Sequence, residues 1–390
     1  MANKTITIKE DTFFNAGKKQ GNYFQEELDY FFENIQQLSI VKQIKPNFLP
    51  FKPVYNLLKW HAKMSVLKHV KDYAPKNFEY LSGLSESTGK SIADYLLISC
   101  ANLYLMRSVY YSRRILYPIL VPMLPDQGDF CSCVMGFDDD EDPFLFKNLD
   151  YMKDLEGSIF IRDLNVDGSY RLISQSFIMM PQVIQGMNEK GLTISLNNGY
   201  GLNKPSRGVP ISIALTEALY DCKDTESAIN FLSQIPIANS GIINIIDQKG
   251  VSASIEVSGE IVKVSPKNKG EKFRIYTNFF LTNELKQVDR YKFVSQTKKP
   301  SAKDTKWKES ADSRFDQIEK FLEKSDGLKI DNLKLLSQYC GGAKTPSPNT
   351  VCMDGVNATL ASSVYYPTQG KIYLTKGNPL NNKFMEFNYK

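Results

Sequence analysis

The chain has 390 residues, of which 42% are hydrophobic and 23% are charged, so it is long enough to bury a substantial core. The 48 basic residues exceed the 43 acidic residues by five, and many of the lysines lie between residues 286 and 310. A lysine-rich run of this kind usually indicates a solvated loop or helix face, and no nucleic-acid recognition motif accompanies it. We therefore expect no nucleic-acid partner.

Residues 1–19 contain neither the apolar core nor the small-residue cleavage site of a signal peptide. No stretch holds about 18 uninterrupted apolar residues, and the best candidate, residues 101–124, contains three arginines. The six cysteines are too sparse for a disulfide scaffold at this length. These features predict a cytoplasmic protein with no membrane span, and a secreted or lysosomal-like protein would look the same after removal of a signal peptide.

The first 125 residues are expected to be mostly helical. Apolar and aromatic residues recur every three to four positions between residues 15 and 38, and two more helices are predicted within residues 73–105, with a break at Thr88–Gly89. This region ends in the turn-rich sequence PDQGDF at residues 125–130.

From residue 131 the pattern changes to short β-strand segments that are punctuated by Gly, Asn and Asp. Two helices, at about 208–221 and 224–234, interrupt these strands. After residue 311 the sequence predicts two further helices and then two closing strands. Strand runs interleaved with helix pairs are typical of an α+β body of layered sheets and helices.

Histidine is scarce, which limits the choice of a catalytic base. The two histidines, His61 and His69, lie in a stretch with helical spacing and are expected to be ordinary helix residues. Cleavage of the Phe130–Cys131 bond would supply another base, because the freed α-amine of Cys131 would have a pKa of about 7.7–8.0, against about 10.4 for lysine. A cysteine at such a new N-terminus carries its own base.

The residues around Cys131 are related by their spacing. Cys131 is followed by serine, and an Asn-Leu-Asp sequence ends at Asp150, nineteen positions after Cys131 and seventeen after Cys133. A Cys followed by Thr or Ser, with an Asn-x-Asp whose aspartate lies nineteen positions on, resembles the N-terminal-nucleophile (Ntn) hydrolases of the choloylglycine hydrolase superfamily. The sequence looks most similar to the isopenicillin N acyltransferase-like branch of the linear amide C–N hydrolases. The spacing favours Cys131 over Cys133 as the nucleophile.

Further segments resemble the same superfamily. GMNEKGL at residues 186–192 is similar to a hairpin of the bile-salt hydrolases, and YTNFFLT at 276–282 to a strand end of the acyltransferases. A Ser-Arg-Phe sequence around Arg314 resembles a bile-salt hydrolase motif, and residues 358–379 resemble the closing strands. Residues 75–97 are similar to the prosegment of the acyltransferase branch, so the resemblance covers nearly the whole chain.

The resemblance implies a role for each polar residue of these motifs. Cys131 would be the nucleophile and Asp150 would hydrogen-bond its α-amine, while Asn197 and Asn278 would stabilise the oxyanion and position the substrate. Arg314 would steady the surroundings of the nucleophile. Each of these residues also has an ordinary structural explanation. Cys131 could be a cysteine within a strand, and Asp150 could cap a turn. Asn197 and Asn278 could be strand-end asparagines bonded to loop backbone, and Arg314 could lie on a helix surface.

Two further residues are expected to contact the substrate. Lys147 stands where the bile-salt hydrolases have Arg. It keeps the positive charge but lacks the planar guanidinium group, which can donate two parallel hydrogen bonds. Asn198 adjoins Asn197, which leaves an ambiguity of one residue in the assignment. Phe130 precedes the nucleophile where the acyltransferase precursor has Gly, so the cleavage site is unusual for the branch.

The resemblance implies a four-layer αββα Ntn sandwich over residues 131–390, preceded by a mostly helical prosegment at 1–130 that stays bound after self-cleavage as an α chain. It implies a self-processing cysteine amidase acting on the linear amide of a small N-acyl compound through an acyl-enzyme, with acyltransferase activity also open. The alternative is a binding or scaffold protein that keeps the fold without processing. No metal and no organic cofactor is implied.

Overall fold

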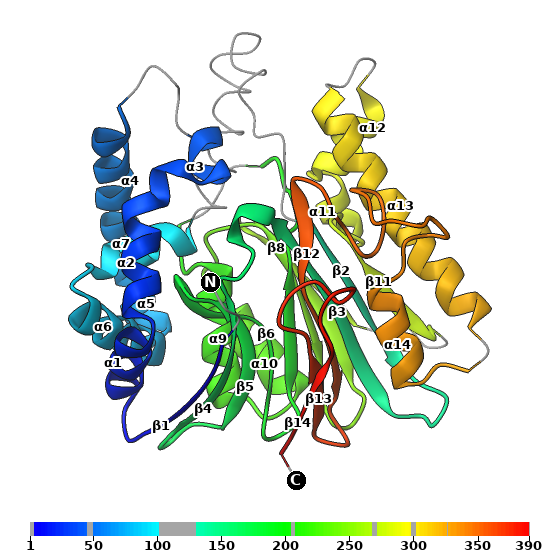
Figure 1. Cartoon of the computed structure of the whole chain (residues 1–390), viewed down its shortest axis with the longest axis horizontal. Coiled ribbons are helices and arrows are strands. Elements are labelled where there is room, and N and C mark those ends of the chain that lie inside the picture. The colour runs from blue at the N-terminus through cyan, green and yellow to red at the C-terminus, as the bar shows by residue number, and fades with distance from the viewer. Residues whose placement is uncertain are drawn as a thin grey trace.

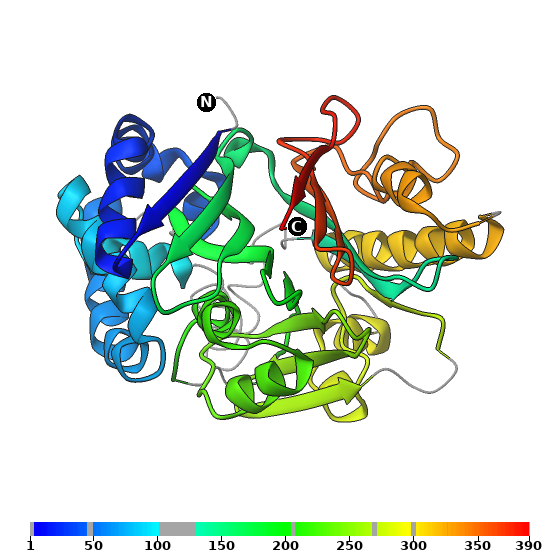
Figure 2. The same cartoon turned by 90° about the horizontal axis from the view of Figure 1, so that it is seen from below.

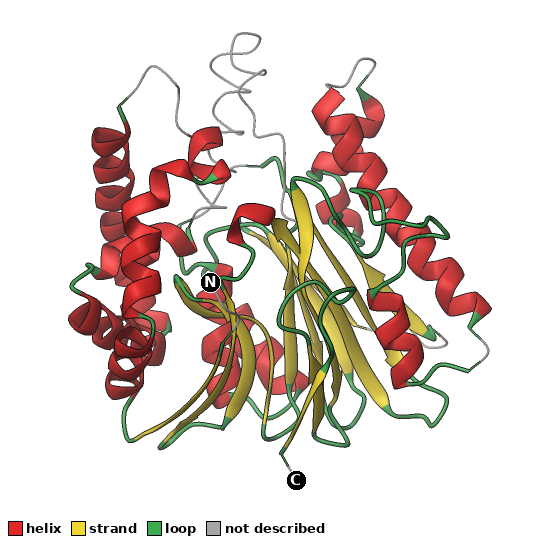
Figure 3. Cartoon of the chain, viewed as in Figure 1, coloured by secondary structure: helices red, strands yellow, loops and turns green. Residues whose placement is uncertain are grey.

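The computed structural model describes residues 4–44, 50–100, 130–203, 207–266, 271–297, 302–325 and 327–389. Two β-sheets lie face to face at its centre, and helices cover the outer side of each sheet (Figure 1, Figure 3). The α+β class and the layering expected from the sequence are confirmed.

The larger sheet has eight strands, and all its neighbouring strands are antiparallel except the first pair. In spatial order the strands are β1 (Thr5–Glu10), β4 (Ile159–Val166), β5 (Leu172–Phe177), β6 (Met180–Asn188), β7 (Thr193–Asn197), β8 (Gly241–Ile246), β9 (Ser252–Ser258) and β10 (Ile261–Pro266). The predicted turn between β6 and β7 is present, and Gly191 has the positive φ of 76° that such a turn requires.

The smaller sheet has six antiparallel strands. In spatial order they are β11 (Phe273–Tyr276), β2 (Phe130–Phe137), β3 (Pro143–Met152), β12 (Asn357–Tyr366), β13 (Lys371–Leu374) and β14 (Met385–Asn388). In the register of these strands Asp150 pairs with Phe130 on one side and with Thr359 on the other. This register places the aspartate beside the Phe130–Cys131 bond.

The N-terminal helices form one group on the outer side of the larger sheet, coloured blue and cyan in Figures 1 and 2. They are α1 (Phe13–Tyr23), α2 (Gln25–Asn34), the 3-10 helix η1 (Ile35–Gln37), α3 (Ser39–Ile44), α4 (Phe51–Ser65), α5 (Leu67–Tyr73), α6 (Pro75–Thr88) and α7 (Ile92–Ser99). The expected break after α6 is present, because Gly89 ends the helix with a φ of 68°. Within the described ranges no helix is both long and apolar enough to span a membrane.

The remaining helices complete the outer layers. Two of them, α9 (Ile211–Asp221) and α10 (Thr225–Ser233), pack on the larger sheet. Three others, α11 (Asn283–Lys286), α12 (Arg290–Gln296) and α13 (Ala302–Lys324), follow β11, and α14 (Ile330–Ser337) packs on β12. A single 3-10 turn, η3 (Lys153–Leu155), follows β3.

Strand alternation explains the layers. In β4, Phe160 and Leu164 belong to the core shared with the N-terminal helices, whereas Ile161 belongs to the core between the two sheets. On the smaller sheet, Val134 faces the layer formed by α13 and α14. Each sheet is therefore apolar on both faces.

The structure adds elements that the sequence did not predict. The segment at 5–10 is a strand rather than part of a helical region, and it extends the larger sheet beside β4. The lysine-rich run at 286–310 contains the start of α13, where Trp307 is 2% exposed. The many lysines of this run predicted a solvated segment, so its buried aromatic residues were not expected.

Two glycines allow α1 and α6 to cross in direct contact. A Cβ atom on Gly83 would lie 1.8 Å from the Phe14 carbonyl oxygen, and one on Gly17 would lie 2.0 Å from the Tyr80 carbonyl oxygen. These atoms belong to helix backbone, so a side chain at either position would force the helices apart.

We predict that Gly83→Ala lowers the free energy of unfolding by about 2 kcal/mol or more, because the added methyl group overpacks this crossing. The neighbouring Ser82→Ala should change stability little, since Ser82 is only half-buried and alanine favours the helix. Denaturant unfolding followed by circular dichroism measures both. Equal stabilities for the two variants would contradict the role of the glycine contact.

Candidate active site

Cys131 is the second residue of β2 and is 2% exposed. Its backbone N–H donates to the side-chain oxygen of Asn278 at 3.1 Å. Asn278 lies just beyond the end of β11, the strand that pairs with β2. The pairing of these two strands therefore brings the asparagine to the nitrogen of the bond that self-cleavage would break.

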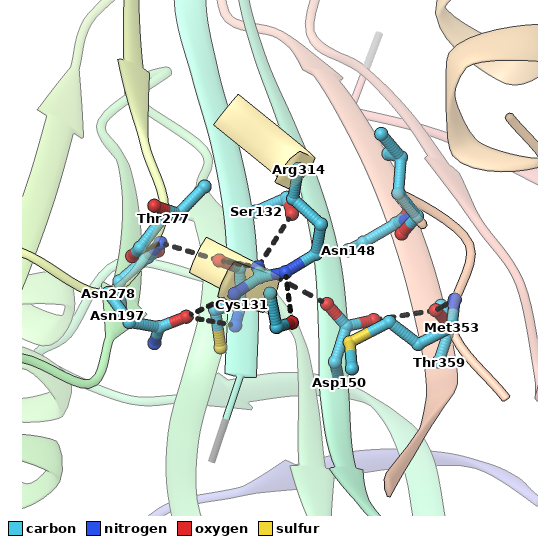
Figure 4. Close-up of polar contacts among 12 residues, drawn as sticks. Cys131, Ser132, Asn148, Asp150, Asn197, Thr277, Asn278, Arg314, Met353 and Thr359 are labelled. Atoms are coloured by element: carbon cyan, nitrogen blue, oxygen red, sulfur yellow. Dashed lines mark hydrogen bonds and ion pairs between the residues drawn. The ribbon is translucent and has the colours of Figure 1, made fainter. Parts of the chain in front are cut away.

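Arg314 reaches the same place from α13 and is completely buried. Its Nη1 donates to the Cys131 carbonyl oxygen at 2.8 Å, and its Nη2 donates to Asn278 Oδ1 at 2.8 Å (Figure 4). A further bond runs from Nη1 to Ser132 Oγ at 3.1 Å. The planar guanidinium thus fixes the cysteine and the asparagine relative to each other.

Asp150 lies on β3 and is fully buried. Its Oδ1 accepts a hydrogen bond of 2.6 Å from the hydroxyl of Thr359, and its Oδ2 lies 3.9 Å from Arg314 Nη1. Among the described residues, Oδ2 has no hydrogen-bond partner. Burial raises the pKa of Asp150 to about 6, against the opposing effect of Arg314.

Asn197 ends β7 on the facing sheet. Its Nδ2 donates to the Thr277 carbonyl at 2.9 Å and to the Tyr276 carbonyl at 3.2 Å, and it lies 3.5 Å from the Cys131 carbonyl oxygen. Its Oδ1 accepts a bond of 3.2 Å from Asn244 and another from the ammonium group of Lys147. The amide is held in one orientation next to Cys131.

Lys147 and Asn198 lie on either side of this asparagine. The Lys147 ammonium is buried and donates to the Leu196 carbonyl at 2.7 Å as well as to Asn197. Lys147 is not among the residues that line the cavity at Cys131, whereas Asn198 is. Asn198 also accepts a bond of 3.0 Å from Asn278 through its carbonyl oxygen.

An apolar cavity opens beside Cys131. It is lined by Cys131, Leu149, Leu196 and Asn198 together with residues of α7, β6 and α9. A second cavity lies between the N-terminal helices and the strands of the body. The two cavities share the lining residues Ile98, Tyr151, Phe177 and Met180.

The structure thus brings the predicted residues Cys131, Lys147, Asp150, Asn197, Asn198, Asn278 and Arg314 into one site. Both histidines lie elsewhere, on α4 and α5, where the Nδ1 atom of each ring contacts Ser65. In the described part of the chain, no three His, Cys, Asp or Glu side chains are grouped so that they could hold a metal ion.

The sequence did not reveal two parts of the site. Thr359 bonds Asp150, and no sequence signal distinguished it, because the same strand also contains Ser362 and Ser363. The sequence also did not reveal that α2, α3 and α4 form cavity walls. Amphipathic spacing predicts which face of a helix is buried, but it does not predict whether that face packs on a solid core or lines a cavity.

The comparisons with known proteins agree with this architecture. The sequence profile of a family described as acyl-coenzyme A:6-aminopenicillanic acid acyl-transferase matches residues 137–381, which is more than half of the chain. The chain belongs to this acyl-transferase family. The resemblance drawn from the sequence is therefore confirmed.

Three solved structures are among those that the chain matches. An N-acylethanolamine-hydrolyzing acid amidase ortholog of Caenorhabditis elegans is 18% identical with a TM-score of 0.41, and the match covers 61% of this chain and 93% of that one. A conjugated bile acid hydrolase of Clostridium perfringens is 15% identical with a TM-score of 0.39, covering 67% and 97%. The penicillin V acylase of Agrobacterium tumefaciens is 15% identical with a TM-score of 0.38, covering 66% and 86%. A search of curated protein sequences finds no match.

The raised pKa of Asp150 predicts how the stability of the uncleaved acyl-transferase homologue depends on pH. A raised pKa means that the folded chain holds this proton more tightly than the unfolded chain does. The resulting stabilisation is fully present below about pH 4 and is lost as the pH rises through about 6. For a shift of roughly two units the loss is at most about 3 kcal/mol.

We therefore expect a Cys131→Ala chain to lose more stability between about pH 4 and pH 7 than the same chain carrying Asp150→Asn. Denaturant midpoints across this pH range measure the difference. Because the other titrating groups are common to both chains, parallel stability curves would show that Asp150 is not responsible.

A second prediction concerns the reactivity of the cysteines. Burial raises the pKa of Cys133 to about 11 and the pKa values of Cys222 and Cys352 to about 12, so these thiols carry almost no thiolate at neutral pH. We expect iodoacetamide to modify Cys131, which lines a cavity, at least tenfold faster than Cys133. Peptide mass analysis over time gives both rates, and equal rates would contradict the assignment.

Proposed function

We propose that the protein is a self-processing cysteine amidase that cleaves the linear, non-peptide C–N bond of an N-acyl compound through an acyl-enzyme. The proposal is supported above all by one observation: Asp150, Asn278 and Arg314 surround the Phe130–Cys131 bond, and the thiol-bearing residue also lines an apolar cavity. Membership of an acyl-transferase family is consistent with this chemistry.

The first reaction would be self-cleavage. It frees the α-amine of Cys131, which then accepts the thiol proton in the next reaction. Asp150 Oδ2 has no hydrogen-bond partner among the described residues and lies on the strand paired with this bond, so it suits an acceptor role for the new amine. Bonding to the charged amine would in turn favour the ionised carboxylate.

The second reaction would be attack of the Cys131 thiolate on the carbonyl carbon of the substrate amide. Asn197 and Asn278 carry side-chain amides close to Cys131, where their N–H groups donate to backbone carbonyl oxygens. Amide N–H donors of this kind stabilise a developing oxyanion when a substrate is bound. The amine leaves with a proton, and the acyl group remains as a thioester on Cys131. Water then releases the acid, or a bound amine takes the acyl group instead; we assign hydrolysis as the default because water is always present.

Residues 1–130 would stay bound after cleavage as the α chain. Strand β1 is hydrogen-bonded to β4, and Glu217 of α9 accepts hydrogen bonds of 3.0 Å from the backbone N–H groups of Lys76 and Asn77 at the start of α6. The N-terminal helices also share one continuous apolar core with the larger sheet. Release of the segment would expose that core to water, which is strongly unfavourable.

The acyl group of the substrate would occupy the two neighbouring cavities. The walls of the cavity beneath α4 are aliphatic and aromatic, whereas the cavity at Cys131 also has polar side chains, namely Ser99, Asn198, Ser212 and Asn239. An apolar acyl chain gains about 0.8 kcal/mol for each methylene that it buries there. The site therefore favours a long apolar acyl group over a short or charged one.

Self-cleavage is tested by a denaturing gel of the purified protein. We expect two fragments, with Cys131 at the N-terminus of the larger one, and a single intact band for Cys131→Ala. An intact wild-type band, together with a Cys131 thiol no more reactive than the other cysteines, would instead favour the binding or scaffold alternative.

The acyl cavity is tested by Leu155→Trp. Leu155 lines only the larger cavity, and the indole would fill its far part, so the specificity constant kcat/KM for a dodecanoyl amide should fall at least tenfold while that for an acetyl amide stays within about twofold. Trp at the exposed neighbour Glu156 is the matched control. An unchanged ratio between the two substrates in Leu155→Trp would show that the acyl chain binds elsewhere.

The identity of the base is tested by pH dependence. Activity of the processed enzyme should rise as the α-amine of Cys131 loses its proton, with an apparent pKa below that of a lysine, and it should persist in a His61→Gln, His69→Gln double variant. Asp150→Asn should lower kcat more than it raises KM in the processed fraction. Loss of activity in the histidine variant, with Asp150→Asn unaffected, would overturn the mechanism.

A further inference from the structure

Phe130, the residue before the nucleophile, has its side chain buried in an aromatic cage, which we define as Tyr200, Trp307 and Met353. Phe130 is 7% exposed, and the three cage residues are at most 2% exposed. The cage lies under α12 and α13, because Trp307 belongs to α13 and Tyr291 of α12 packs against it.

The cage is a rigid structure built from several contacts. The rings of Tyr200 and Trp307 meet edge to face at 5.6 Å with an interplanar angle of 90°. The guanidinium of Arg290 lies 4.9 Å from the Trp307 ring centre and is itself paired with Asp304 at 2.7 Å. A side chain held by such walls has few alternative positions.

Arg314 links the cage to the reacting bond. Its guanidinium carbon lies 5.3 Å from the centre of the Phe130 ring, and its Nη1 donates to the carbonyl oxygen of Cys131. The same group therefore contacts the side chain on one side of the Phe130–Cys131 bond and the backbone on the other.

The cage and the acyl cavity lie on opposite faces of β2. Neighbouring residues of a strand point to opposite sides of the sheet. Accordingly, Cys131 lines the cavity and belongs to the core that includes the N-terminal helices, whereas Phe130 belongs to the cluster beneath α13 and is absent from the walls of both cavities.

We propose that the aromatic cage is a second acyl-side binding site, which takes an aromatic side chain of the protein's own chain and is used only in self-cleavage. The proposal rests on the proposed function and adds a specificity element to it. Self-cleavage is then governed by the cage, and substrate choice by the cavities on the opposite face.

The reaction that the cage would serve is an N-to-S acyl shift. The Cys131 sulfur forms a bond to the Phe130 carbonyl carbon, the bond from that carbon to the Cys131 nitrogen breaks, and the thiol proton ends on the nitrogen. Water then hydrolyses the thioester to the Phe130 carboxylate and the free thiol. Because the carbonyl carbon belongs to Phe130, holding its side chain fixes the carbon against the sulfur, and small misplacements of reacting atoms cost large factors in rate.

The test compares variants of the cleaved residue and of its cage. We expect Phe130→Ala and Trp307→Leu to slow the appearance of the two fragments at least tenfold, and Phe130→Leu, which fills part of the cage, to fall between Phe130→Ala and wild type. Added hydroxylamine, which cleaves thioesters, should not restore the rate in Phe130→Ala, because the slow step precedes the thioester.

Val134→Ala is the matched control, since Val134 lies on the same strand and is fully buried under α13 and α14 but is remote from the cage. It should lose similar thermal stability and still cleave at the wild-type rate. Equal slowing of self-cleavage in Val134→Ala and Phe130→Ala would show that the cage acts only through general packing, and it would overturn the proposal.

The two sites are separated by a reciprocal comparison. Leu155→Trp should cleave itself at the wild-type rate, and processed Phe130→Ala should keep the wild-type ratio of kcat/KM for dodecanoyl over acetyl amides. Wild-type cleavage speed in Phe130→Ala would refute the cage while leaving the amidase function intact. A wild-type chain that never cleaves at Phe130–Cys131 would refute the proposed function itself.

Discussion

The buried guanidinium of Arg314 is the interaction on which the site depends. A buried charge is tolerated only where hydrogen bonds replace its water, and here the replacements come from Cys131 and Ser132 of β2 and from Asn278, just beyond the end of β11. The nearby Asp150 carboxylate, at 3.9 Å, is too far for a direct hydrogen bond. The arginine therefore couples α13 to Cys131 and leaves Asp150 Oδ2 without a hydrogen bond among the described residues, so that it could accept one from the amine that the proposed self-cleavage would create.

This arrangement has opposite electrostatic consequences before and after processing. In the intact chain the Cys131 nitrogen is an amide, and burial raises the pKa of Asp150 against the opposing effect of Arg314. The proposed self-cleavage would convert that nitrogen to an amine and so add a second positive charge beside the carboxylate. The reaction would therefore lower the pKa of Asp150.

Much of this architecture was accessible from the sequence, and the rest was hidden for identifiable reasons. The alternating and helical spacing of apolar residues predicted the layers of sheets and helices. The nineteen-residue interval from Cys131 to Asp150 reflects a hairpin whose register places the two residues close together. No local pattern could show that Thr359 lies beside Asp150, because that contact joins residues 209 positions apart. The strand at 5–10 was also missed, since a short edge strand carries too few residues for its period to be read.

That N-terminal strand has a consequence for the two chains as separate molecules. Because β1 is the edge of the larger sheet and runs parallel to β4, a body lacking residues 1–130 would present the backbone N–H and C=O groups of β4 as an open edge. Open edges recruit strands from other molecules. Under the proposed self-cleavage, synthesis as one chain would supply the edge strand at an effective concentration that two independently made chains would lack.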